Sequence, residues 1–166
     1  MSKFNSTLTA ERLREVLDYD PMTGVFTRLV AKRGYRAGGV SGSIMKIGYV
    51  EIGVDRGRYL AHRLAWLWVY GVLPTGHIDH IDGDKSNNRI TNLRDVEQAV
   101  NMQNLRTARR DNTSCGLLGV HPNRKRWAAQ IIVKGVTYHL GTFDTPEQAH
   151  QVYIGAKRLI HPGCTI

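Results

Sequence analysis

A dense group of polar residues begins at His77, where two histidines, three aspartates and three asparagines fall within seventeen residues. Asp79 and His80 are adjacent, Asn92 follows His80 by 12 residues, and Asn101 follows it by 21. A carboxylate and an amide oxygen are hard but incomplete ligands, which suits Mg²⁺ because this ion keeps several waters and accepts phosphate oxygens. A neutral imidazole beside the ion can take a proton from water near pH 7. This spacing therefore indicates phosphodiester hydrolysis.

Two other metal sites would use the same residues. Asp82, Gly83 and Asp84 suggest a calcium loop, but the EF-hand order of ligands followed by glycine is absent. A zinc site built from His77, His80 and Asp82 would need a fourth ligand, and no cysteine is nearby. We therefore expect Asp82 and Asp84 to shape the loop through hydrogen bonds from side chain to backbone. A role for His77 beside the site stays open.

The elements around this group must bring its residues together. A short strand ending at His80, a polar loop and a helix over residues 95–105 would carry Asn101 toward the strand end. Adjacent residues of a regular strand point to opposite faces. We therefore expect Asp79 and His80 to lie where the strand bends into the loop, just before the Gly83-Asp84 turn.

The N-terminal part of the chain should form the scaffold for this site. Thr9 can cap a first helix whose leucines and valine share one face. Alternation and turn residues predict strands over residues 25–30 and 48–54. Apolar residues at helical spacing predict a helix over residues 58–71. His62 in that helix is interpreted as a packed helical residue without a catalytic role.

The C-terminal third has the pattern of a separate small module. Three strand patterns are followed by a helix, with Lys134-Gly135 as the tight turn between the second and third strands. Thr145, Pro146 and Gln148 form a capped helix start with a capping box. A basic linker over residues 106–114 precedes the module.

Charge and composition limit the possible functions. The chain has 166 residues and a net charge of +9, and residues 106–166 carry nine Lys and Arg against three Asp and Glu. This excess favours a polyanionic partner, and we expect double-stranded DNA. Two scattered cysteines argue against a disulfide framework. No apolar run is long enough to span a membrane, and no signal peptide is evident, so we expect a cytoplasmic protein.

The central motif resembles the HNH endonucleases. The matching segments are HRLAW, GHIDHIDGDKSNNRITNLR and QAVNMQN, together with the opening LDYDPMTGVFTRL. The likeness runs from about Leu8 to Asn104 and is greatest to the phage and intron-associated subgroup with asparagine as the third motif residue. The resemblance implies that His80 is the general base, that Asp79 and Asn101 bind Mg²⁺ or Mn²⁺, and that the products are a 5′-phosphate and a 3′-hydroxyl. It also implies that Asn92 supports the site by bonding across the loop.

The C-terminal module resembles the APETALA or ethylene-response-factor type of DNA-binding domain, over Gly119 to about Leu159, most clearly in LGTFDT and AAQI. In that family a three-stranded sheet enters the DNA major groove while the helix packs behind it. Alternation along the strands places Trp127 toward the helix. The predicted DNA contacts are His121, Arg124, Lys125, Arg126, Gln130, Lys134, Thr137 and His139.

We therefore predict an α+β protein made of a ββα-metal (HNH) nuclease domain and a three-stranded sheet plus helix that binds DNA. The nuclease region spans residues 1–105, with its core at 74–105 after an N-terminal part at 1–73, and the second domain spans residues 115–166. The predicted function is a metal-dependent DNA endonuclease, homing-type or a free-standing phage enzyme, working as a monomer or weak dimer and, if phage-encoded, in the bacterial host cell. The alternative is a catalytically inactive, sequence-specific DNA-binding regulator. An RNA-binding module is disfavoured because stacked aromatic residues are lacking.

Overall fold

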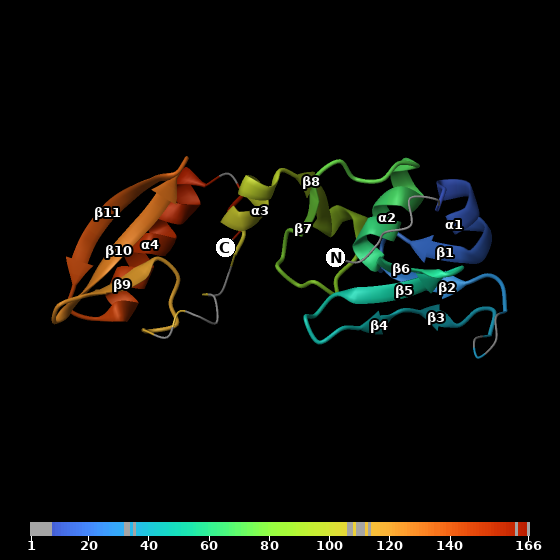
Figure 1. Ribbon diagram of the computed structural model, residues 1–166, viewed down its shortest axis with the longest axis horizontal. Coiled ribbons are helices and arrows are strands. Elements are labelled where there is room, and N and C mark those ends of the chain that lie inside the picture. The colour runs from blue at the N-terminus through green and yellow to red at the C-terminus, as the bar shows by residue number, and fades with distance from the viewer. Residues whose placement is uncertain are drawn as a thin grey trace. The chain divides into compact units, whose positions relative to one another are not determined.

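The computed structural model describes residues 8–165, apart from residues 32, 33, 35, 106, 107, 109–111, 113 and 162. The chain divides into two compact units, residues 1–97 and 98–166, which Figure 1 colours blue to green and yellow-green to red. Both units combine short helices with small antiparallel sheets, which confirms a mixed α and β fold. No helix in the described part of the chain is long and apolar enough to cross a membrane.

The described residues of the first unit form eight strands, two α-helices and one 3-10 turn. Antiparallel pairing joins them into two three-stranded sheets, β1-β2-β3 and β4-β5-β6, and the two-stranded β7-β8. The bounds are α1 (Ala10–Val16), β1 (Leu17–Asp20), β2 (Val25–Arg28), β3 (Val40–Ser41), β4 (Ser43–Ile44), β5 (Val50–Val54), β6 (Gly57–Leu60), α2 (Ala61–Tyr70), β7 (His77–His80), η1 (Ile90–Asn92) and β8 (Leu93–Val96).

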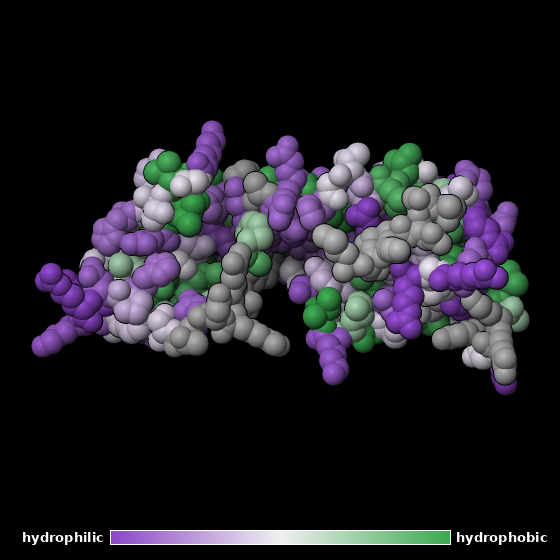
Figure 2. Space-filling model, viewed as in Figure 1, coloured by the Kyte–Doolittle hydropathy of each residue, from purple (hydrophilic) through white to green (hydrophobic). Residues whose placement is uncertain are grey.

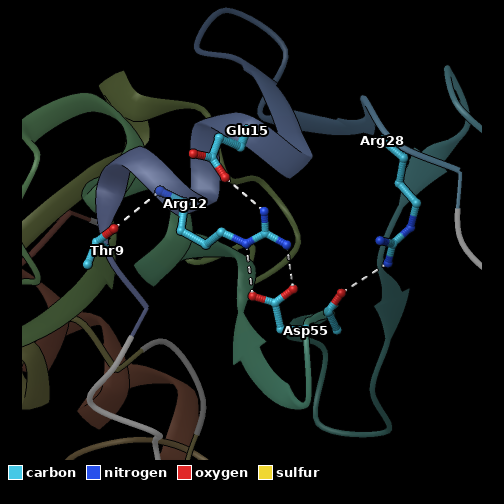
Figure 3. A network of polar contacts seen from close by, with 6 residues as sticks. Thr9, Arg12, Glu15, Arg28 and Asp55 are labelled. Atoms are coloured by element: carbon cyan, nitrogen blue, oxygen red, sulfur yellow. Dashed lines mark hydrogen bonds and ion pairs between the residues drawn. The ribbon is translucent and has the colours of Figure 1, made fainter.

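Polar contacts tie α1 to the hairpin of β5 and β6 (Figure 3). Thr9 caps α1 as predicted, because its Oγ1 accepts from the Arg12 amide at 3.2 Å. The Arg12 guanidinium donates to Asp55 at 3.0 and 3.2 Å and to Glu15 at 2.8 Å. Arg28 donates to a backbone carbonyl of β5 at 3.0 Å. Exposed ion pairs add little stability, so these contacts chiefly set the position of the hairpin.

The predicted helix over residues 58–71 begins later than expected, and its first residues are a strand. Asp55 and Arg56 make a two-residue turn, after which β6 pairs with β5 from Val54↔Gly57 to Glu51↔Leu60. Leu60 lies at helical spacing from the apolar residues of α2, which is why the sequence predicted a helix there. The tight turn instead directs residues 57–60 back along β5. The helix ends at Gly71, whose left-handed backbone (φ 76°) suits glycine.

One apolar core holds the first unit together and carries the β7-β8 pair. Helices and sheets contribute buried side chains to it, and Ile78 of β7 and Leu93 of β8 join the same cluster. Because both strands of the pair are anchored in this way, the end of β7 has a fixed place against α2 and the core. The residues of the candidate site thus sit on a packed scaffold.

The helix predicted over residues 95–105 is also shorter than expected. Asp95 and Val96 belong to β8, where they pair with Ile78 and His77 of β7. The helix α3 covers Gln98–Gln103 and belongs to the second unit. Asp95 and Val96 hydrogen-bond to β7 in place of forming a helical turn, because tertiary pairing overrides a weak local helix propensity.

The second unit contains the predicted β-β-β-α order. After α3 come β9 (Val120–Asn123), β10 (Arg126–Val133), β11 (Val136–Phe143) and α4 (Pro146–Ile160). The sheet order is β11-β10-β9, antiparallel throughout. Thr145 and Gln148 make both bonds of the predicted capping box.

The helix α4 packs against one face of this sheet (Figure 1). Val120, Ala129 and Ala149 are fully buried there, with Trp127 packed against them as expected from the alternation. Gly119 (φ 70°) lies against the Tyr153 ring so closely that a Cβ would overlap it. A bulge at Leu140 shifts the register between Ala129↔Gly141 and Gln130↔His139. The opposite face of the sheet carries polar side chains.

Candidate functional site

The loop between β7 and β8 is built by Asn92 at the end of η1. Its amide Nδ2 donates to Asp82 Oδ1 and to the Asn87 carbonyl, both at 2.9 Å, and its Oδ1 accepts from the Asp82 backbone amide at 3.0 Å. Asn92 is itself buried. These bonds cross the loop and fix the backbone directly after His80. The resemblance implied bonding of this kind across the loop, and the role of Asn92 in supporting a catalytic site stays a prediction.

Asp82 and Asp84 shape the same loop. Asp82 Oδ1 accepts from the Asp84 amide at 2.8 Å, and Asp84 Oδ1 accepts from the Ser86 amide at 2.9 Å and its hydroxyl at 2.7 Å. Burial acts to raise the pKa of Asp82, but hydrogen bonds from Asn87 and Asn92 lower it overall. The predicted bonds from side chain to backbone are therefore confirmed for both aspartates.

Asp79 lies in the regular part of β7, opposite Arg94 of β8. The Arg94 Nε and Nη2 donate to Asp79 Oδ2 at 2.8 and 2.6 Å. The Asp79 side chain is only 6% exposed and that of Arg94 26%. A buried carboxylate needs a cation or several donors to stay charged. The buried Asp79 carboxylate therefore favours a cation beside it, and Arg94 is one such cation.

His80 is the last residue of β7, and the chain turns immediately after it. The Gly83 amide donates to the His80 carbonyl at 2.9 Å, closing the turn. The pair was expected to lie in the bend itself, but both residues keep their regular pairing with β8, and the chain turns only after His80. Adjacent side chains of a regular strand point to opposite faces, so Asp79 and His80 do not share one face of β7.

The ring of His80 is buried among three side chains from different elements. Asn88 Oδ1 lies 3.5 Å from its Nε2. The rings of His62 on α2 and Tyr49 lie with their centroids 5.1 and 6.0 Å away. Burial lowers the pKa of His80, although Asn88 and the surrounding aspartates oppose the shift. The imidazole is therefore neutral at pH 7, the form that can accept a proton.

His62 is the site residue that sequence reasoning missed. It was interpreted as a packed helical residue, and it is indeed buried, but its ring meets His80 edge-on with an interplanar angle of 83°. Burial, and then the neighbouring His80 and Arg63, lower its pKa to about 3. Its Nδ1 is buried without a hydrogen-bond partner among the described residues. The segment HRLAW was the available signal.

Tyr49 completes the surroundings of the two histidines. Its ring contacts that of His62 with centroids 5.3 Å apart, and the Lys85 ammonium lies 4.9 Å from its centre. Burial, and secondly the charge of Asp79, raise the pKa of Tyr49. Lys85 belongs to the loop that follows β7, so this contact links the loop to the β4-β5 hairpin that carries Tyr49.

The other predicted metal ligand, Asn101, lies on α3 in the second unit. In that unit the neighbouring Gln103 accepts from the Gly163 amide at 3.0 Å, and the Asn104 carboxamide accepts a hydrogen bond from the Thr165 hydroxyl. These contacts anchor α3 to the chain segment that follows α4. The role of Asn101 as a metal ligand stays a prediction.

The predicted DNA-contacting residues lie on one face of the β11-β10-β9 sheet of the second unit and at its turns. The register pairs Gln130 with His139, Ile132 with Thr137 and Ala128 with His121, so these residues share the face away from α4. Arg126 begins β10 on this face and pairs with Asp144 at 2.8 Å. The structure therefore groups His121, Arg126, Gln130, Thr137 and His139.

The three remaining basic residues lie at the two hairpin turns of the sheet. Arg124 and Lys125 form the turn from β9 to β10, and Lys134 begins the turn from β10 to β11. Arg124 and Lys134 adopt left-handed backbone conformations, with φ of 54° and 50°. Figure 2 shows hydrophilic side chains projecting at the end of the sheet where β9 joins β10.

Comparison with known proteins places this site in a family. The model of the HNH endonuclease family matches residues 59–103, which include His62, Asp79, His80, Asn92 and Asn101. Protein 3.8 of Escherichia phage T7 is 31% identical over 101 residues, which cover 59% of this chain and 82% of that protein. The chain contains an HNH endonuclease domain over residues 59–103.

A second viral relative carries the name of the same family. An uncharacterized HNH endonuclease of Acanthamoeba polyphaga mimivirus is 32% identical over 111 residues, 65% of this chain. The chain spans only 56% of the length of that relative. No solved structure matches the chain. At the level of the family, HNH proteins are nucleases that hydrolyse DNA and generally use divalent metal ions.

Proposed function

We propose that this HNH protein is a metal-dependent DNA endonuclease that leaves a 5′-phosphate and a 3′-hydroxyl. The observation that carries the proposal is the buried His80, next in the chain to the buried carboxylate of Asp79 and at the end of a strand whose following loop is held by Asn92. All these residues lie inside the segment that matches the family.

His80 is the general base of the proposed reaction. Its imidazole accepts a proton from the attacking water, for which a neutral ring is required at the working pH. The surrounding aromatic rings and Asn88 restrict its movement, which preserves the geometry that proton transfer needs. Asn92 supports this position through the loop bonds and does not itself contact the substrate.

The donor set fits a divalent cation. Asp79 supplies a buried carboxylate that already has a cationic partner in Arg94, and Asn101 would supply an amide oxygen. Oxygen ligands of this kind suit Mg²⁺ or Mn²⁺. When bound, the ion would polarise the scissile phosphate and stabilise the leaving 3′ oxygen. Arg94 would then be able to contact phosphate, since guanidinium binds phosphate as well as carboxylate.

The C-terminal module serves as the targeting domain in this proposal. Its open sheet face presents Gln130, Thr137 and His139, and its turns present Arg124 and Lys134. Glutamine and arginine can hydrogen-bond to base edges, whereas lysine at a turn is suited to phosphate. By the resemblance to the plant domains, Ile132, Thr137 and His139 stand where those domains have arginine or tryptophan, so anchoring should outweigh base readout.

The biological setting proposed is a homing-type or free-standing phage enzyme, acting on DNA in the cytoplasm of a bacterial host as a monomer or weak dimer. Both relatives are viral. Cleavage of both strands by a monomer would require two successive nicks or a transient dimer.

Conversion of supercoiled plasmid tests the proposed function directly. The full-length protein is incubated with plasmid in Mg²⁺, Mn²⁺ or EDTA, and the product ends are identified by enzymatic labelling. Nicked or linear products that require the metal and carry 5′-phosphates are expected. Tight DNA binding without any cleavage, on plasmid and on a random-sequence library, would contradict the proposal and favour the inactive DNA-binding protein.

A further inference from the structure

Asn88 is a buried side chain whose amide oxygen faces the His80 ring. Only 3% of Asn88 is exposed. Its backbone carbonyl accepts from the Tyr19 hydroxyl at 2.6 Å, and its side-chain Nδ2 donates to the Ser86 carbonyl at 2.9 Å. Asn88 is thus tied both to the core strand β1 and to its own loop, and its side chain has little freedom to rotate.

The bond to Ser86 determines which way the Asn88 carboxamide faces. A backbone carbonyl only accepts hydrogen bonds, so the NH₂ end must point to Ser86. The reversed amide would place two carbonyl oxygens against each other. The Oδ1 end is therefore directed at His80, where it lies 3.5 Å from Nε2. Hydrogen bonds to catalytic groups are often long before substrate binds.

An amide oxygen can only accept, so the histidine nitrogen facing it must carry the proton. We propose that Asn88 is a positioning residue that holds neutral His80 with its proton on Nε2, leaving Nδ1 as the nitrogen that takes the proton from water. Tautomers of histidine are commonly set by the hydrogen bond at the other ring nitrogen. The catalytic meaning of this assignment rests on the proposed nuclease function, but the tautomer itself does not.

The neighbouring rings complete the arrangement. His62 meets His80 nearly perpendicularly and Tyr49 is inclined at 52° to it, so rotation of the His80 ring would collide with packed aromatic groups. Asn88 determines which nitrogen of His80 carries the proton, and the rings of His62 and Tyr49 restrict the orientation of the His80 ring plane. Asn92, by contrast, holds the loop through its bonds to Asp82 and to the Asn87 carbonyl.

Nitrogen NMR of the metal-free, full-length protein tests the proposal. Long-range ¹H–¹⁵N correlation identifies which ring nitrogen is protonated, and His80→Gln assigns the signals of His80. We expect Nε2 to show the shift of a protonated nitrogen and Nδ1 that of an unprotonated one. A wild-type His80 protonated at Nδ1 overturns the proposal without any variant being needed.

Variants then test whether Asn88 is the cause. Asn88→Leu, which keeps the size but removes the acceptor, should give averaged shifts of two exchanging tautomers. Asn87→Ala is the matched control, because Asn87 lies in the same loop and bonds to Asp82 instead. Unchanged His80 shifts in folded Asn88→Leu overturn the proposal.

Kinetics separate this inference from the proposed function. Asn88→Leu should lower kcat by about 10- to 100-fold, part of the 10²–10⁴ that general-base catalysis contributes, with KM nearly unchanged. Wild-type protein with the Nε2 proton but no metal-dependent cleavage would support the positioning and contradict the nuclease. Cleavage by wild type with the proton on Nδ1 would do the reverse.

Discussion

The imidazole of His62 meets that of His80 edge-on, with ring centroids 5.1 Å apart, although 18 residues separate the two in the chain. One ring comes from α2 and the other from the end of β7. Their contact joins the apolar helix α2 to the candidate base, so substitutions in α2 should change the position of the His80 ring.

His62 should make the protein sensitive to acid. Its pKa is about 3 in the folded protein and near the ordinary 6.5 when unfolded. The unfolded chain therefore binds more protons between these values, and stability falls as pH drops from about 6.5 toward 3, at up to about 1.4 kcal/mol per pH unit. Urea unfolding from pH 7 to pH 4 measures this dependence, and His62→Phe should flatten it. An equally steep dependence in His62→Phe would assign the effect to other groups.

Asn92→Ala should destabilise the protein by about 2–3 kcal/mol, because three hydrogen bonds of about 1 kcal/mol each are lost in a buried place. Urea unfolding gives the change in free energy. Asn123→Ala is the control, since Asn123 is exposed and its single side-chain bond is long at 3.5 Å. A loss below about 0.5 kcal/mol in Asn92→Ala would show that the loop does not depend on these bonds.

Arg94→Met should leave Asp79 buried without its main cationic partner, which costs about 3 kcal/mol or more. If Asp79 binds metal, Mg²⁺ should restore part of this loss. The melting temperature is measured in Mg²⁺ and in EDTA for both proteins, and we expect a larger increase with Mg²⁺ in Arg94→Met. Equal increases in the variant and in wild type would argue against Asp79 as a ligand.

Arg124→Asn should stabilise the protein and weaken DNA binding together. Asparagine tolerates the left-handed backbone at this turn better than arginine, giving a gain of up to about 1 kcal/mol. If the Arg124 guanidinium neutralises one phosphate, its loss should reduce the magnitude of the salt slope for duplex DNA binding by about 0.9. Arg158→Gln on α4, away from the open sheet face, is the control for charge. An unchanged slope in Arg124→Asn would remove this turn from the interface.

Local sequence patterns were sufficient to predict the sheet of the second unit, β9 to β11, but not the arrangement of the candidate site. The bounds of β10 and β11 follow from alternation and from the Lys134-Gly135 turn, and the capping box marks the start of α4. β8 was missed because Leu-Arg-Asp-Val has no strong strand signal and becomes a strand only by pairing with β7. The contact of His62 with His80 depends on packing between distant segments, which no local pattern contains.

The central claim is that His80 removes the proton from the attacking water, and one comparison tests it most directly. Plasmid cleavage in Mg²⁺ is measured for wild type, His80→Ala and His77→Ala, while fluorescence anisotropy follows duplex binding. His77 lies exposed at the other end of β7 and serves as the matched control. We predict that His80→Ala loses at least about 10²-fold in cleavage rate while its binding and the His77→Ala activity stay near wild type. Cleavage by His80→Ala at the wild-type rate would contradict the account.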